Sequence, residues 1–516
     1  EDIRYHFMFQ FLVGNLEFLG LRLDYAFNLP SIISFITAFM LLYALALKLT
    51  GKMRAAVLAC LFFAFRSAKT LYTFLAGIRP AKGIIKTLID NRAFISDTPH
   101  EDWGLWNLNV YCNQRHLALG LTVMFFIILL FIEHPFDMYD RLKARSHEDK
   151  KADPDREEAL KSIFRRILSC IKELFFSWKA WLPKDIRTSI AAGIFLGSLG
   201  FFHGAALIGC ILVLFVMAII STRRLEFLIT AIITMALSFT QTSFFINGSA
   251  VKPELLFGFI AENKTFFGVL SYLERLLGVL PLLLLVAFCI ENGVNRWMLL
   301  AFCAPLVFAF NVSLTVDVTV NHKYIMMGCI LLGIYAASLL DRLLQDAKYM
   351  VRALAVLLII MMTATGVYDF YTVLKRNNPD SAVVLDLESP LTKWIKNNSN
   401  SQDIFLTHEY ALNQLVLGGA MLYEGWPYFP WSAGYDTEKR EDQVIAMYEA
   451  DSFEELDRLV KENRIRFIVV DQDNRNSNYY DLNEENIKNS YECVYSEGEG
   501  ESKISIYDAD KPIKRQ

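Results

Sequence analysis

A series of long apolar stretches between residues 29 and 370 constrains this chain more than any other feature of its sequence. A helix needs about 20 apolar residues to cross a bilayer, and ten stretches approach that length. They cover residues 29–49, 55–76, 117–133, 186–202, 205–221, 225–244, 266–290, 297–316, 324–340 and 350–370. Hydrophobic residues form 54% of the chain, and its charged fraction of 21% lies below the roughly 25% of soluble domains. These values exclude a soluble enzyme, a disordered chain and a disulfide scaffold.

The lysines and arginines between the stretches predict the orientation of the chain. Connections rich in these residues stay in the cytoplasm. If residues 29–49 run from outside to inside, the inner connections hold 22 Lys and Arg and the outer ones about 10. We therefore expect a plasma-membrane protein with residues 1–28 outside and, after ten crossings, everything beyond residue 371 outside as well. The net charge of −4 gives no basis for binding nucleic acid, which requires concentrated basic surface.

The first residue is Glu1 and not Met, and the segment that follows it is hydrophilic. Such a segment does not normally reach the outer face without help. We therefore expect a further membrane helix before Glu1 and take the chain as a fragment or processed form. A cleaved signal peptide is the alternative.

The connection 134–187 and the tail after residue 374 differ from the membrane stretches. Within the connection, residues 160–178 place apolar side chains at helical spacing, so we expect a helix lying on the inner leaflet. In the tail, residues 403–409 and 466–471 are typical of short buried strands, and residues 438–450 and 452–464 of helices. We expect an all-α polytopic membrane domain (1–374) and a small extracytoplasmic α/β domain (375–516).

Acidic residues at the start of the chain are the first candidates for catalysis. Glu1, Asp2 and His6 precede an apolar stretch that resembles a surface helix. A carboxylate at this water boundary can take a proton from an acceptor hydroxyl or hold a divalent cation. Alternatively, Asp2 only caps the helix that follows.

Polar and cationic residues open two later stretches on the same predicted side. Arg115 and His116 precede one, and Asn321, His322 and Lys323 precede the other. This placement suits a lipid-linked phosphate at headgroup level, although snorkelling and capping would place such residues similarly. The histidines have no HExxH spacing and the cysteines no CxxC spacing, so we predict no metal site from these motifs.

Two further groups are candidates for binding. Arg66 and Lys69 lie three residues apart inside a stretch, where charges mark a cavity, a pathway or an ion pair, and Glu274 is the acid that could pair with them. In the tail, Trp426 and Trp431 belong to an aromatic segment that can stack on sugar rings or dock the domain at the membrane.

Several segments together resemble a known superfamily. These are the acidic segment with His6, "NVYCNQRHLALG" at 109–120, "NHKY" at 321–324, and a tail with "IFLTHE", "GWPYFPWSAGYD" and "IRFIVVD". The chain resembles bacterial multi-pass proteins of the GT-C glycosyltransferase superfamily, distant relatives of protein mannosyltransferases and arabinosyltransferases. The resemblance covers the whole layout, but the tail and the segment around Arg115 carry most of it.

The resemblance implies an enzyme that moves a sugar from a polyprenyl-phosphate donor to an acceptor outside the membrane. The acceptor-activating carboxylate of the family would fall on Asp2 or Glu1, and Arg115, His322 and Lys323 would stabilise the departing lipid phosphate. The identity of the cofactor is left open, and a divalent cation is one candidate. The other functions considered are a transporter or flippase with Arg66, Lys69 and Glu274 along its path, and a non-catalytic envelope protein with the same fold.

Overall fold

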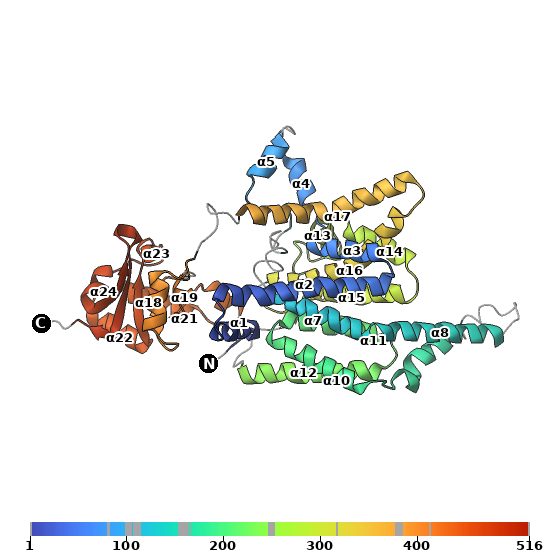
Figure 1. The fold of residues 1–516 in the computed structure, drawn as a ribbon, viewed down its shortest axis with the longest axis horizontal. Coiled ribbons are helices and arrows are strands. Elements are labelled where there is room, and N and C mark those ends of the chain that lie inside the picture. Colours follow the sequence, from blue (N-terminus) through green and yellow to red (C-terminus); the bar gives the residue numbers. More distant parts are fainter. Residues whose placement is uncertain are drawn as a thin grey trace. The chain divides into compact units, whose positions relative to one another are not determined.

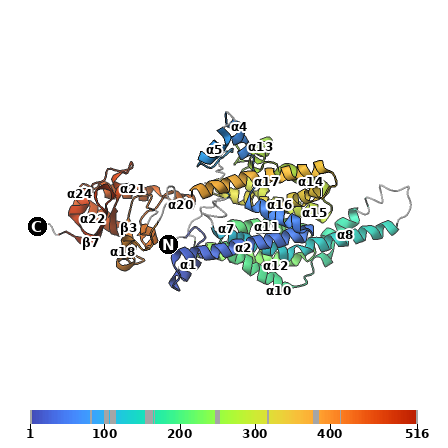
Figure 2. The same ribbon diagram turned by 45° about the horizontal axis from the view of Figure 1, so that its top comes forward.

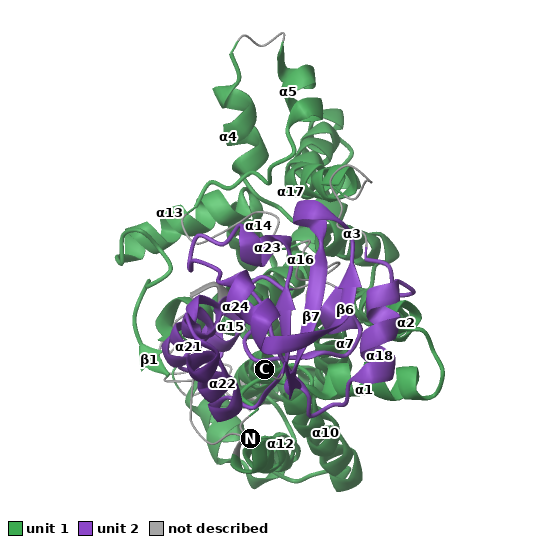
Figure 3. Ribbon diagram, turned by 90° about the vertical axis from the view of Figure 1, so that its left-hand side faces the viewer, with its two compact units in different colours: residues 1–377 green, residues 378–516 purple. Residues whose placement is uncertain are grey.

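The computed structural model describes residues 3–79, 83–98, 106, 115–152, 164, 167–245, 253–315, 318–376, 385–411 and 414–513. The chain divides into two compact units, residues 1–377 and 378–516, coloured separately in Figure 3. Each unit is described by itself.

The first unit is helical (Figure 1). Its helices are α1 (Met8–Phe18), α2 (Leu23–Thr50), α3 (Met53–Ala64), α4 (Thr70–Gly77), α5 (Ile84–Asp90), α7 (Arg115–Phe131), α8 (Glu133–Ala152), α10 (Ile186–Ser198), α11 (Gly204–Ile219), α12 (Arg224–Phe245), α13 (Phe266–Leu277), α14 (Leu280–Ile290), α15 (Val294–Asn311), α16 (His322–Leu344) and α17 (Tyr349–Arg376). Two short strands, β1 (Glu254–Leu255) and β2 (Val312–Ser313), form an antiparallel pair.

Six helices among the described residues are long and apolar enough to cross a membrane, which indicates an integral membrane protein. They are α2, the continuous α7–α8 segment, α12, α15, α16 and α17. The α13–α14 pair would be a seventh crossing but is bent by 103°, and α3, α10 and α11 are shorter apolar helices. The predicted count of ten crossings is therefore not confirmed.

The stretch expected at 55–76 is not one helix. It breaks after α3, where Phe65 is extended (φ −128°, ψ 91°), and resumes at α4. The freed backbone groups have partners: Lys69 N–H donates to Arg275 O (3.2 Å), and Ala68 O accepts from Thr365 Oγ1 (2.9 Å). Such partners are what a broken helix needs at membrane depth.

The α13–α14 bend lies against this break. Gly278 has φ +59°, and an added Cβ would come within 3.1 Å of Ala68 O. The Ser67 hydroxyl donates to Leu277 O (2.6 Å). The bend therefore requires glycine both for its backbone angle and for the close approach.

Helix α16 lies at the centre of the first unit. It packs against α3, α11, α14, α15 and α17, and its residues from His322 to Asp341 are all buried. Figures 1 and 2 both show α2, α7, α11, α15 and α16 running alongside one another. This end-to-end burial places the start of α16 inside the protein.

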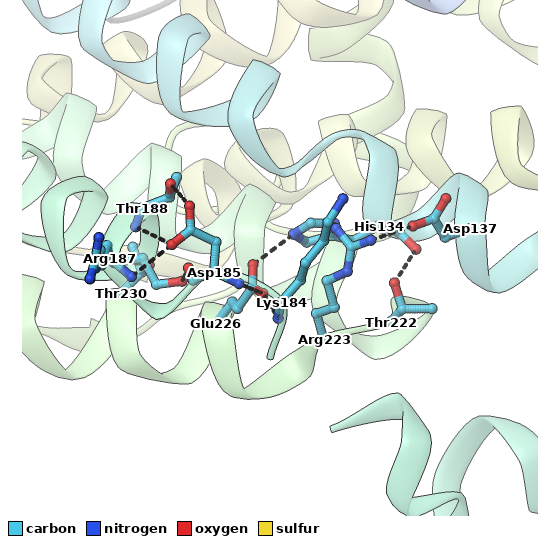
Figure 4. Close-up of polar contacts among 11 residues, drawn as sticks. His134, Asp137, Lys184, Asp185, Arg187, Thr188, Thr222, Arg223, Glu226 and Thr230 are labelled. Carbon is cyan, nitrogen blue, oxygen red and sulfur yellow. Dashed lines mark hydrogen bonds and ion pairs between the residues drawn. The ribbon is translucent and has the colours of Figure 1, made fainter. Parts of the chain in front are cut away.

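A polar network joins α8, α10 and α12 near the chain turn at residue 222 (Figure 4). The buried Glu226 carboxylate accepts from the backbone N–H groups of Lys184 and Asp185 (2.5 and 3.0 Å) and contacts His134 Nε2 at 3.2 Å. Asp185 in turn caps α10 through the N–H groups of residues 187 and 188. The network ties the starts of α10 and α12 to the start of α8.

The amphipathic segment is only partly as expected. Helical residues end in a π-helical turn, Lys172–Phe176, and not in a regular helix through residue 178. Apolar side chains of the described part stand exposed, among them Phe164, Ile167, Phe176 and Trp178. Its position on a membrane surface stays a prediction.

The second unit is a three-layer α/β fold. Five strands, β3 (Ile404–Leu406), β4 (Met421–Leu422), β5 (Ile465–Val470), β6 (Tyr491–Glu497) and β7 (Ile504–Pro512), form a sheet in the order β4-β3-β5-β7-β6. β3 pairs in parallel with β4 and β5, and β7 pairs antiparallel with β5 and β6. The helices are α18 (Pro390–Asn398), α19 (Gln414–Leu417), α20 (Tyr428–Ser432), α21 (Glu438–Glu449), α22 (Phe453–Glu462), α23 (Gln472–Arg475) and α24 (Glu484–Ser490).

The contacts of β5 define the layers of this unit. Phe467 and Val469 pack with α18 on one face, while Ile468 and Val470 pack with α21 and α22 on the other. Both faces are buried, as the continuous apolar run of this strand indicates. The tail is therefore a small sheet domain, as predicted, with the predicted strand at 403–409 shortened to three residues.

Candidate functional site

Three histidines from distant parts of the chain meet in the first unit. His6 lies before α1, His116 in the first turn of α7, and His203 at the start of α11. The Nε2 atoms of His6 and His116 are 2.7 Å apart, and the His203 ring lies 5.4 and 5.2 Å from the other two rings. We call these three residues the histidine cluster.

Hydrogen bonds limit the protonation states of the cluster. The 2.7 Å contact between His6 and His116 requires one nitrogen to donate and the other to accept. His203 Nδ1 accepts from Ala206 N–H (3.0 Å), so a neutral His203 carries its proton on Nε2. That Nε2 atom is buried and has no hydrogen-bond partner among the described residues. It is a donor available to a ligand.

Lys323 adds a positive charge beside the cluster. Burial first, and then the charges of His116 and Lys323, hold the pKa of His6 well below its usual range. Lys323 is itself buried at the start of α16. The site therefore combines neutral imidazoles with one cation, Lys323. This combination favours binding of an anion over binding of a metal ion or protonation of both His6 and His116.

A second polar site, the Arg66 cavity, lies where α3 breaks and α13 bends. It holds about 20 Å³ and is lined by Arg66, Ser67, Trp106 and His322 together with apolar side chains. The Arg66 guanidinium lies 5.7 Å from the Trp106 ring, and Tyr272 Oη is 3.1 Å from His322 Nε2. A cavity of this volume admits about one water, so a larger ligand would require the walls to move.

The predicted residues are thus brought together in part. His6 and His116 are in contact, and Arg66 and His322 share a cavity. Lys69 is separate from Arg66: it is exposed and forms an ion pair with Glu274 at 2.8 Å, the alternative weighed for these charges. Asn321 donates both of its amide hydrogen bonds to backbone carbonyls of residues 309 and 312.

The remaining predicted residues lie outside this region or outside the described part. Glu1, Asp2 and the side chain of Arg115 are beyond what the structure describes. Trp426 lines a cavity of the second unit, and Trp431 is half exposed, 6.1 Å from the Tyr428 ring. His203 was not among the predicted binding residues, although its position between two apolar helices on the predicted outer side was a usable signal.

One group of described residues has the spacing of a metal site. His408, Asp471 and Asp473 each offer an atom within 4.8 Å of the others, and His408 Nε2 lies 3.2 Å from Asp473 Oδ2. Asp471 already caps α23 through its other oxygen. These residues of the second unit could therefore hold a divalent cation, and they are different residues from the acids predicted at positions 1 and 2.

The sequence matches no protein-family model and no curated protein. Among solved structures, the chain is similar to the oligosaccharyltransferase of Archaeoglobus fulgidus. The apo form gives 11% identity and a TM-score of 0.44 over 91% of this chain and 62% of that one. The complex with an inhibitory peptide and a dolichol-phosphate gives 11% and 0.43, and the complex with Zn and sulfate 12% and 0.43. The chain spans about three-fifths of the length of these proteins.

Proposed function

We propose that the chain is an integral-membrane glycosyltransferase of the GT-C type, which moves a sugar from a polyprenyl-phosphate donor to an acceptor on the outer face of the plasma membrane. Support comes from the sequence resemblance and from six helices suited to crossing a membrane. The observation that carries the proposal is the histidine cluster with Lys323. Four separate segments bring these residues together, namely the residues before α1 and the starts of α7, α11 and α16.

The proposed reaction is a direct displacement at the anomeric carbon of the sugar. The acceptor oxygen forms the new bond, the bond from that carbon to the lipid phosphate breaks, and its electron pair stays with the phosphate. Asp2 or Glu1 takes the proton of the acceptor hydroxyl. A divalent cation held by these acids would be the cofactor of this reaction, whose identity the sequence leaves open.

Cations and hydrogen-bond donors would stabilise the departing phosphate. Lys323 supplies charge, and the buried Nε2–H of His203 supplies a donor already aligned by the Ala206 contact. Arg115 and His322 are the other residues proposed for this role. Membrane lipids are the remaining partners, and we propose that residues 378–516 lie outside the cytoplasm.

The test is sugar transfer by the full-length protein in liposomes. Polyprenyl-phosphate sugars are added, and the release of polyprenyl phosphate is measured with and without a chelator. A Glu1→Gln, Asp2→Asn double variant should lose turnover, whereas Glu17→Gln, an exposed acid of α1, should not. Unchanged turnover in the double variant would remove these acids from the mechanism.

The same liposomes separate the enzyme from its alternatives. Donor consumption without solute flux supports the transferase. Flux without consumption would make the protein a carrier, and neither would leave a non-catalytic envelope protein. Of the charges considered for a carrier's path, Lys69 and Glu274 form an ion pair with each other, and the cavity beside Arg66 holds only about 20 Å³.

A further inference from the structure

The second unit contains a cavity that the proposed reaction does not use. It holds about 190 Å³ and lies where the parallel strands β3 and β4 end. Residues 407–410 follow β3, residues 424–428 follow β4, and α21 and residues 479–480 complete the wall. Ligands of α/β folds commonly bind at the carboxyl ends of strands. We call it the acidic cavity.

Three carboxylates face this space: Glu409, Glu424 and Glu441. No lysine, arginine or histidine is among its lining residues. Glu424 is 7% exposed, and no hydrogen bond or ion pair joins its carboxylate to another described residue. A buried, unpaired carboxylate aimed into a cavity is costly for an empty protein.

Neighbouring charges do not remove this cost. Burial, followed by Glu441, raises the pKa of Glu424 to about 7, against the lowering effect of Arg440. Arg440 donates to Tyr423 O and lies outside the cavity lining. Burial also raises the pKa of Glu409, and there His408 acts in the opposite direction.

Aromatic rings form the rest of the wall. Trp426 lies 6.0 Å from the Tyr410 ring and 5.4 Å from the Tyr428 ring, and Tyr479 and Tyr480 line the other side. The faces of such rings attract cations, most strongly where water is excluded. Negative groups and ring faces therefore surround one space.

We propose that the acidic cavity binds a small organic cation, an ammonium group carried on a body of the size of choline or a single amino sugar. The carboxylates would neutralise the ammonium and the rings would cover its substituents. A bare metal ion fits less well, because these three acids are not among the described groups whose ligand atoms come within 4.8 Å of one another. The inference does not depend on the proposed transferase activity.

The test uses the full chain in nanodiscs of phosphatidylglycerol, a lipid whose headgroup carries neither an ammonium group nor a sugar. Choline, glucosamine, glucose and Mg²⁺ are titrated at pH 7, where glucosamine still carries its ammonium charge and Glu424 is partly ionised, and binding is followed by calorimetry and by tryptophan fluorescence. At least one of the two ammonium compounds should bind ten times more tightly than glucose. Choline and glucosamine together distinguish a quaternary from a primary ammonium ligand.

Variants assign the binding to this cavity. Glu424→Gln should weaken binding of the cation at least tenfold. Glu441→Gln should also weaken it, and this second variant serves as the test if Glu424→Gln folds poorly. Glu438→Gln, an exposed acid of the same helix, is the matched control. Because the bound form needs an ionised Glu424, the wild-type affinity should fall by up to roughly tenfold per pH unit below pH 7.

Four results would overturn the proposal. They are the absence of tighter binding than glucose for both choline and glucosamine, tighter binding of Mg²⁺ than of either ammonium compound, no binding of any probe, and unchanged affinity in both cavity variants. Normal hydrogen-exchange protection of β5 in a variant would show that its second unit is folded, so that lost affinity reports on the cavity.

Discussion

Gly120 of α7 controls how closely the histidine cluster can assemble. A Cβ atom at this position would lie 2.7 Å from Ala206 Cβ and 3.3 Å from the Cβ and Cγ atoms of His203. Carbon atoms pack best at about 3.5–4.0 Å. In Gly120→Ala, α7 and α11 must therefore separate locally by close to 1 Å, and His116 lies one turn away on the same helix.

The cost of this change follows from overpacking. An added methyl group in a close-packed contact destabilises by about 1–3 kcal/mol, and here neither neighbour is the flexible end of a side chain. Separation of the helices would also lengthen the 5.2 Å distance between the His116 and His203 rings. We expect lower thermal stability and a loss of turnover of roughly a hundredfold, as 1 Å misplacements of reacting groups cause.

A matched substitution lies beside the same cluster. Gly204, next to His203, has nothing within 4 Å of an added Cβ. Gly204→Ala should leave stability unchanged or raise it by about 0.4–1 kcal/mol, with normal turnover. The two variants thus carry the same substitution, glycine to alanine, and differ in the space around the added methyl group.

The assay does not rest on activity alone. Each variant in detergent is heated for its unfolding midpoint and treated with diethylpyrocarbonate, and modification of His116 and His203 is measured by mass spectrometry. The buried histidines should react slowly in the wild type and in Gly204→Ala but faster in Gly120→Ala. Equal midpoints and equal histidine reactivity in the two variants would refute this reasoning.

Three further predictions concern single charges. Glu226→Ala should lower stability by about 3–5 kcal/mol, because the N–H groups of Lys184 and Asp185 lose their acceptor in a buried site, and a normal melting midpoint would contradict this. The pKa of Glu424, about 7 in the fold, lies above its usual 4.5, so the cost of its charge is absent below pH 4.5 and complete above pH 7. Glu424→Gln should therefore gain about 2 kcal/mol over the wild type between those pH values, less than the full shift because the carboxylate faces a water-accessible cavity. If the difference in β5 hydrogen-exchange protection between the variant and the wild type is the same at both pH values, this prediction is wrong. Lys323→Gln should reduce donor turnover by roughly a hundredfold while the exposed Lys264→Gln does not, and equal rates would exclude Lys323 from phosphate binding.

Local patterns predicted the elements better than their interruptions. The apolar stretches lead to α2, α15, α16 and α17, and the run around β5 leads to a strand buried on both faces. The break at residues 65–69 depends on Thr365 and Arg275, nearly 300 and about 200 residues away. No window along the sequence contains those partners, so averaged hydropathy merges α3 and α4.

The same reason limits prediction of the sites. His6 and His116 were singled out by their positions at predicted outer helix ends, and they do meet. Their meeting with His203 depends on how α7 packs against α11. In the second unit, the aromatic segment with Trp426 was visible in the sequence, but the three acids beside it come from three separate segments.

The charges at the ends of α16 run against the electrical polarity of the helix itself. A helix favours anions near its N-terminus and cations near its C-terminus, yet α16 begins with His322 and Lys323 and carries the buried Asp341 in its last turns. At the C-terminal end, Lys52 lies 3.0 Å from Asp341 and Gln345 donates to it. At the N-terminal end, a bound phosphate would neutralise the charge of Lys323 and would interact favourably with the positive end of the helix dipole. Release of the phosphate would again leave the Lys323 charge next to the positive end of the helix dipole. The helix would therefore favour the phosphate-bound state of the site over the empty one.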